Sequence, residues 1–243
     1  MAEEKQQERK KLKYEQYFDE FCIENEEDII TVCDIASKSL ENKFGNRIAD
    51  PKIIAIIFNS CYYSILNLLK ENEKTHSEFA VNVANRLEIK FTTTDDEDDE
   101  KQGNFMVSIT PIKSDKKEDV VSEGDTVVSR YAIWNIVNTS DTKDYSDLIK
   151  AGAMKILEEK MGIHCDTDEI IIPLFILTYE ALVEYIKLRR KEMDSFEYEV
   201  NFIGCFYIGA RETDDVDDVI YIRPNIDSKL TLKNDEDASA KNE

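Results

Sequence analysis

The chain has 243 residues, 42% of them hydrophobic, and its formal net charge is −21. This length allows two domains of ordinary size with packed cores, and so negative a charge disfavours nonspecific binding to nucleic acid or anionic membranes. No apolar run approaches the ~20 residues of a membrane span, the N-terminus lacks the apolar core of a signal peptide, and the five scattered cysteines are typical of reduced, mostly buried intracellular thiols.

The first half of the chain predicts a charged arm, two helices and a set of strands. Residues 1–25 are rich in Glu, Lys and Gln and predict a charged helical arm. A first helix then ends at Gly45, and Asp50-Pro51 supplies an N-cap and a first helical residue for a second helix. From Phe79 the apolar residues alternate, which indicates strands. The apolar positions of the two helices are Ile29, Val32, Cys33, Ala36, Leu40 and Phe44, then Ile53, Ile54, Ile57, Phe58, Cys61, Ile65, Leu68 and Leu69. Those of the strands are Phe79, Val81, Val83, Leu87, Ile89 and Phe91, with Phe105, Val107 and Ile109 on the return.

The second half predicts the same order of elements. Gly162 ends the first helix, and Pro173 fits the first turn of the second, since deeper in a helix it would cost ~3 kcal/mol. The apolar positions of the helices are Leu148, Ala151, Ile156 and Met161, then Leu174, Phe175, Leu177, Leu182 and Ile186. The outgoing strand carries Phe196, Tyr198, Val200, Phe202, Phe206 and Ile208, and the returning strand Ile220 and Ile222.

The two halves repeat one pattern at an interval of 117 residues. Phe58 falls on Phe175, and Tyr62 falls on Tyr179. The same interval places Val83 on Val200, Ile89 on Phe206 and Phe91 on Ile208, and after an acidic segment the match resumes, shifted by four, with Pro111 on Pro224. A chance match would rarely preserve a helical period and an alternating period together, so the sequence predicts a tandem duplication.

Short motifs in the second half resemble the HU/integration host factor family of DNA-bending proteins. Ile203-Gly204-Cys205-Phe206 is similar to the family's Phe-Gly-Thr-Phe corner, where a glycine lets a strand bend. Ile222-Arg223-Pro224, followed by Lys229-Leu230, is similar to the family's closing segment. The first half keeps Pro111 but has Leu87 where Gly204 stands. The resemblance implies an α+β fold of two tandem units, each helix–helix–bent antiparallel sheet with an arm hairpin, joined as a pseudo-dimer. Two independent α+β modules of another kind are the alternative.

These considerations divide the chain into five parts. The predicted parts are residues 1–25 (charged helical arm), 26–113 (first unit), 114–143 (linker), 144–233 (second unit) and 234–243 (disordered acidic tail). The linker carries a less polar patch at Tyr131, Ile133, Trp134 and Val137.

The arm positions depart from the family. Family arms are basic and carry a proline that wedges between base pairs. Here both arm positions lack proline and are acidic, so they would repel phosphates where the family gains counterion-release energy. The candidate interaction arms contain Asp95, Asp96, Glu97, Asp98, Asp99 and Glu100, then Glu212, Asp214, Asp215, Asp217 and Asp218. Gly204 is the candidate strand corner.

Other chemistry finds little support in the sequence. The only histidines, His76 and His164, are not at ligand spacing, and the glycines form no phosphate-binding cluster. The acidic run at 95–100 lacks the glycine and residue order of a calcium loop. One basic cluster, Lys187, Arg189, Arg190 and Lys191, lies near a predicted helix C-terminus, where the helix dipole favours it. We therefore expect no enzyme activity, cofactor or metal.

The resemblance also indicates a setting. Crass-like tailed bacteriophages carry proteins similar to integration host factor in their structural modules, and tandem copies there build rings of the tail or head-to-tail connector. We therefore expect a non-enzymatic virion ring subunit, assembled in the bacterial host cytoplasm. Its expected partners are other virion proteins and further copies of itself, with no stable duplex DNA binding and no membrane. Two alternatives are an architectural DNA-binding protein and an acidic DNA-mimic inhibitor.

Overall fold

The computed structural model describes residues 11–22, 24–73, 78–84, 86–93, 105–111, 144–165, 168–212 and 219–224. The chain folds as α+β, and in each half two helices precede the strands, as the sequence predicts. The helices are α1 (Lys13–Phe21), α2 (Glu26–Phe44), α3 (Pro51–Glu73), α5 (Ser146–Ile156), the π turn η1 (Leu157–Met161), the 3₁₀ turn η2 (Asp168–Ile170) and α6 (Ile171–Glu192). The strands are β1 (Glu78–Val83), β2 (Leu87–Thr93), β3 (Phe105–Pro111), β4 (Glu197–Phe202), β5 (Phe206–Arg211) and β6 (Val219–Pro224).

Local signals set the helix ends, as predicted. Gly45 and Gly162 both end helices in the left-handed conformation, with φ of 75° and 66°, which glycine adopts without steric cost. Asp50 caps α3, because its side chain accepts a 2.9 Å hydrogen bond from the Lys52 amide and Pro51 begins the helix. Pro173 is the third residue of α6, within its first turn.

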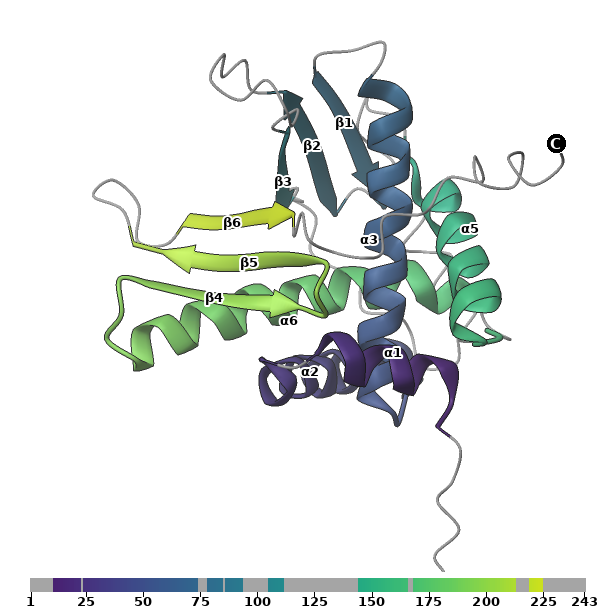
Figure 1. The fold of residues 1–243 in the computed structure, drawn as a ribbon, viewed down its shortest axis with the longest axis horizontal. Helices are drawn as coiled ribbons and strands as arrows, with labels where there is room; N and C mark the ends of the chain where they lie inside the picture. The colour runs from purple at the N-terminus through teal and green to yellow at the C-terminus, as the bar shows by residue number, and fades with distance from the viewer. Residues whose placement is uncertain are drawn as a thin grey trace, which may run out of the picture.

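The six strands form one antiparallel sheet in the order β1-β2-β3-β6-β5-β4. The halves meet where β3 pairs with β6 through Val107 and Ile222. Figure 1 shows β1–β3 and β4–β6 as two three-stranded groups, with α3 and α6 crossing in the middle of the molecule. The strands of one half therefore continue directly into the sheet of the other.

The hairpin turns correct the predicted register of the repeat. Val83 pairs with Leu87 at the end of β1, and Phe202 pairs with Phe206 at the end of β4. Leu87 therefore corresponds to Phe206, at an interval of 119, and it does not stand where Gly204 stands. The predicted single outgoing strand of the second half is two strands, because the chain reverses at residues 203–205.

The helices of the two halves are exchanged. The first helix of each half packs extensively against the second helix of the other: α2 against α6, and α5 against α3. Phe58 of α3 stacks on Phe175 of α6 with ring centroids 4.8 Å apart, and both rings are buried. The buried side chains of both halves form one hydrophobic cluster. Each half therefore completes its core with helices from the other.

The edge strands are capped by the same exchange. The Asn201 amide of edge strand β4 donates a 3.1 Å hydrogen bond to Asn25, which precedes α2. The carbonyl of Asn82 in edge strand β1 accepts a 2.9 Å bond from the amide of Tyr145, which precedes α5. Asn82 and Asn201 are equivalent positions at the 119-residue interval, so each half bonds the other half's edge strand at the matching place. Such capping protects edges that would otherwise recruit other strands.

Three predicted core positions are exposed. Leu148 of α5 is 50% exposed, because the buried stripe on α5 and η1 runs through Ile149, Ala153 and Leu157 to Met161 at four-residue steps. The predicted Ala151 is also exposed and Ile156 is half-buried, so of the four predicted positions only Met161 belongs to the core. Phe196 is 66% exposed, since it lies before β4 and not within it.

The N-terminal helix belongs to the folded body. Tyr14 and Phe18 of α1 are buried, and the Tyr14 hydroxyl donates a 2.9 Å bond to Asp50. Asp19 pairs with Lys52 at 2.6 Å. The segment predicted as a charged helical arm therefore contains a helix, α1, that packs against α3 through buried side chains.

Candidate interaction surfaces

The predicted strand corner is a tight turn. Ile203 and Gly204 have φ of 47° and 66°, and the Gly204 amide donates a 3.0 Å bond to the Asn201 side chain. A Cβ on Gly204 would lie 3.3 Å from the Phe21 ring of α1. Glycine is favoured here both by the left-handed backbone and by the close approach of α1.

A buried polar cluster holds α1 against this turn. The Cys205 thiol accepts a 3.1 Å bond from the Tyr63 hydroxyl and lies 3.7 Å from the Tyr17 hydroxyl. Asn59 donates a 3.3 Å bond to the Tyr17 hydroxyl. Burial raises the pKa of the Cys205 thiol and that of the Tyr17 hydroxyl. Both groups therefore stay protonated near neutral pH, which suits a structural contact better than a nucleophile.

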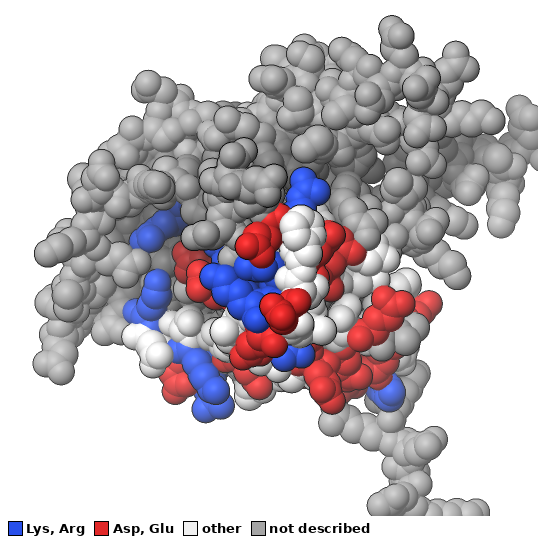
Figure 2. All heavy atoms as spheres, turned by 90° about the vertical axis from the view of Figure 1, so that its left-hand side faces the viewer, with Lys and Arg blue, Asp and Glu red and all other residues white. Residues whose placement is uncertain are grey.

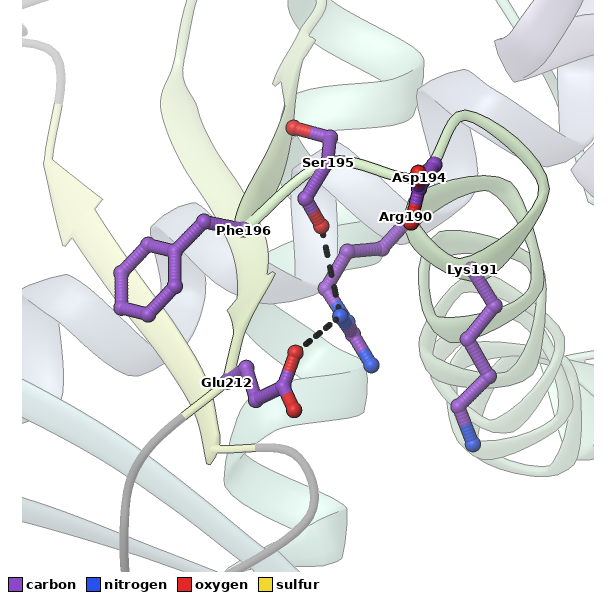
Figure 3. Close-up of a pocket in the computed structure, with 6 residues that line it drawn as sticks. All are labelled: Arg190, Lys191, Asp194, Ser195, Phe196 and Glu212. Carbon is purple, nitrogen blue, oxygen red and sulfur yellow. Dashed lines mark hydrogen bonds and ion pairs between the residues drawn. The ribbon is translucent and has the colours of Figure 1, made fainter.

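The base of the second arm is fixed to α6. Arg190 is only 6% exposed, and its Nη1 donates to the Ser195 carbonyl at 3.3 Å and to Glu212 at 3.2 Å. These residues line a pocket of about 380 Å³ together with Lys191, Asp194 and Phe196. Figure 3 shows Glu212 and Ser195 converging on the guanidinium while the Phe196 ring points away from the pair.

The other arginine of the predicted basic cluster also has a partner. Arg189 pairs with Glu192 at 3.2 Å. Tyr185, one turn earlier in α6, and Tyr198 of β4 both donate to the Asp28 carboxylate of α2, the latter at 2.7 Å. Burial and then the Asp28 bond raise the pKa of Tyr198 to about 12, and the same causes raise the pKa of Tyr185 further. This cluster ties α2 to α6 and β4.

The outer face of β4–β6 carries a self-packed tyrosine. Tyr221 lies across Gly209, where an added Cβ would clash with the ring, and its hydroxyl bonds Glu197. The Arg211 guanidinium stacks over the same ring, 5.8 Å from its centroid. Burial and then Glu197 raise the pKa of Tyr221. The sheet face is thus occupied by the chain's own side chains.

The predicted arm residues divide between described and undescribed parts of the chain. Glu212 lies at the arm base and Gly204 in the turn, as given above. The rest lie outside the described residues: Asp95, Asp96, Glu97, Asp98, Asp99, Glu100, Asp214, Asp215, Asp217 and Asp218. Sequence reasoning missed the Arg190–Glu212 pair, although Arg190 follows Leu182 and Ile186 at four-residue steps and so falls on the buried stripe of α6.

Within the described ranges, no group of three or more His, Cys, Asp or Glu side chains could hold a metal ion, and no helix is long and apolar enough to span a membrane. His164 lies in an exposed turn, 3.9 Å from Glu158. His76 lies outside the described residues.

No known protein family, curated protein or solved structure matches this chain.

Proposed function

We propose that this chain is a non-enzymatic assembly protein, a tandem HU/integration host factor-like pseudo-dimer that serves as a virion ring subunit in the tail or head-to-tail connector of a bacteriophage. The observation that carries the proposal is the exchange of contacts between the halves. In the HU family two chains intertwine into one body, and a covalent pseudo-dimer would keep such an exchange within one chain. Here α2 packs on α6 and α5 packs on α3, and each half caps the other's edge strand.

The arm base favours assembly over DNA binding. A DNA-binding arm needs free cations beside the phosphates. Here Arg190, a guanidinium at the base of the second arm, is already held by Glu212. The two arm sequences carry eleven carboxylates between them. Contacts to protein surfaces tolerate such charge, whereas contacts to a phosphate backbone do not.

The end of α6 offers a contact surface. Three exposed apolar side chains lie near or just after the end of α6, and we call them the α6 end patch: Leu188, Met193 and Phe196, with exposures of 55%, 54% and 66%. Figure 2 views the molecule from the side at which α6 ends and shows uncharged side chains interspersed with side chains of both charges. The position in α3 equivalent to Leu188 is Glu71, which is exposed. The two halves thus present different surfaces, as heterologous ring contacts require.

Sedimentation velocity tests the proposal. Wild-type protein should form one high-order species of defined size, and the double variant Leu188→Gln, Phe196→Ser should shift to smaller species. Leu148→Gln is the matched control, because Leu148 is equally exposed but lies on α5. A monomeric wild type that the end-patch variant leaves unchanged would refute the ring role. Tight binding of a basic DNA-processing enzyme by that monomer would favour the DNA mimic.

A further inference from the structure

Helix α1 packs on α3, but among the described residues no equivalent helix packs on α6. The main partners of α3 are α1, α2, α5, α6, β1 and η1. Those of α6 include the equivalent of each of these elements except α1. Two α3 side chains contact α1: Lys52 pairs with Asp19, and Asn59 donates to the Tyr17 hydroxyl. The equivalent of Asn59 at the 117-residue interval is Ile176. Ile176 is nevertheless fully buried in the complete chain.

The sequence contains a second copy of the α1 motif at the same interval. Lys13-Tyr14 and Tyr17 of α1 fall on Arg130-Tyr131 and Trp134. This is the interval that relates Phe58 to Phe175, so no gap separates the motif from the helices that follow it. The 32 residues between Pro111 and Asp144 provide enough chain to reach α6.

We propose that residues 130–138 dock on the Ile176 face of α6 as the second half's counterpart of α1. The Tyr17 hydroxyl contacts the polar side chain of Asn59 on α3. In the second half both positions are less polar, because Trp134 replaces Tyr17 and Ile176 replaces Asn59, so an apolar contact would replace a polar one. The last turn residue before β5, Cys205, touches Tyr17. The last turn residue before β2 is Arg86, whose guanidinium would provide a cation–π partner for the indole.

The docking would extend the duplication to three helices per half. It would also place an equivalent helix beside each hairpin turn, as α1 lies beside Gly204. This proposal depends on the internal repeat and not on the virion role, so either can fail without the other.

Trp134 is the only tryptophan in the chain, and its fluorescence tests the docking directly. In the full-length protein, we expect emission shifted to the blue of N-acetyltryptophanamide and weak quenching by acrylamide. Ile176→Ala should shift the emission to the red and increase quenching, and the milder Ile176→Val should do so partially. Ile149→Ala is the matched control, because Ile149 is an equally buried isoleucine on α5 and should leave the emission unchanged.

Two results would overturn the proposal. One is a wild-type protein whose emission maximum and acrylamide quenching match those of N-acetyltryptophanamide. This measurement needs no variant. The other is a protected Trp134 that responds no more to the Ile176 variants than to Ile149→Ala, with circular dichroism confirming that all of them are folded.

Discussion

Phe58 and Phe175 occupy equivalent positions in the two halves and stack on each other, with centroids 4.8 Å apart and an interplanar angle of 24°. Each is at most 1% exposed. One contact therefore joins both copies of the repeat to a single core. The energetics of this pair report on whether the two halves fold as one unit.

Truncating either ring should destabilise the whole protein. Phe58→Ala and Phe175→Ala should each lower the free energy of unfolding by about 3–5 kcal/mol, because each removes a buried ring and leaves a cavity. The double variant should lose less than the sum, since the two rings are in contact. Urea titration followed by circular dichroism provides the measurement. Two separate transitions, only one of them sensitive to each variant, would mean that the halves fold independently.

Gly204 and Ala84 should respond to substitution in opposite ways. Both lie in equivalent hairpin turns and have positive φ. Ala84 is the first residue after β1, with φ of 49°, and Gly204 is the second residue after β4, with φ of 66°. Gly204→Ala should cost about 1–2 kcal/mol, because a side chain there meets left-handed strain and the Phe21 ring. Ala84→Gly should cost nothing or stabilise the protein slightly, because it relieves the same strain. Thermal melts of both variants give the comparison, and an equal loss for the two would contradict the described turn.

Removing Arg190 should weaken the base of the second arm. Arg190→Ala should cost about 2 kcal/mol, because it removes charge-assisted hydrogen bonds to Glu212 and to the Ser195 carbonyl. The neighbouring Lys191→Ala, at an exposed position, should change stability by no more than about 0.5 kcal/mol. Hydrogen exchange at the amides of β5 should rise in the first variant only. A neutral Arg190→Ala would show that the pair contributes nothing.

Alkaline pH should destabilise the protein through tyrosines whose pKa is raised in the folded state. The pKa of Tyr198 rises from 10.0 to about 12 on folding, so the folded state holds its proton where the unfolded state has lost it. Stability is therefore fully present below pH 10 and falls as the pH rises from about 10 to 12. Tyr198→Phe should make this fall less steep in urea titrations across that range. An unchanged slope would mean that Tyr198 ionises equally in both states.

Duplex DNA should not bind at physiological salt, because the arm sequences are acidic. Lowering the salt should rescue little, since the Debye length grows from about 8 Å toward 30 Å at ~0.01 M and extends the repulsion. A gel-shift titration at low salt provides the measurement. Submicromolar binding to any duplex would favour the architectural DNA-binding protein instead.

Features governed by neighbouring residues were predictable, and those governed by distant contacts were not. Gly45, Gly162 and Asp50-Pro51 act within one turn of helix, so their sequence signals were sufficient. The two-residue change of interval at the hairpins was not predictable, because alternation alone cannot distinguish one bent strand from two strands with a tight turn. Val81 on Val200 and Ile89 on Ile208 fit the correct interval of 119, but Val83 on Val200 fits the wrong one equally well.

The exchange of helices between the halves was also beyond the sequence pattern. Apolar stripes on α2 and α5 show that each helix is buried, but they do not show against which half. The same limit explains Leu148 and Phe196, which match an apolar period yet are exposed. For the interaction surfaces, the acidic character of the arms was readable from composition, whereas the Arg190–Glu212 pair depends on how α6 meets β5.

Negative-stain imaging of the purified full-length protein tests the central proposal most directly. If the chain is a virion ring subunit, the images should show closed rings with a fixed number of subunits, joined by contacts that repeat around the circle. A field of isolated particles of monomer size, at protein concentrations well above those of the gel shift, would contradict the ring assignment.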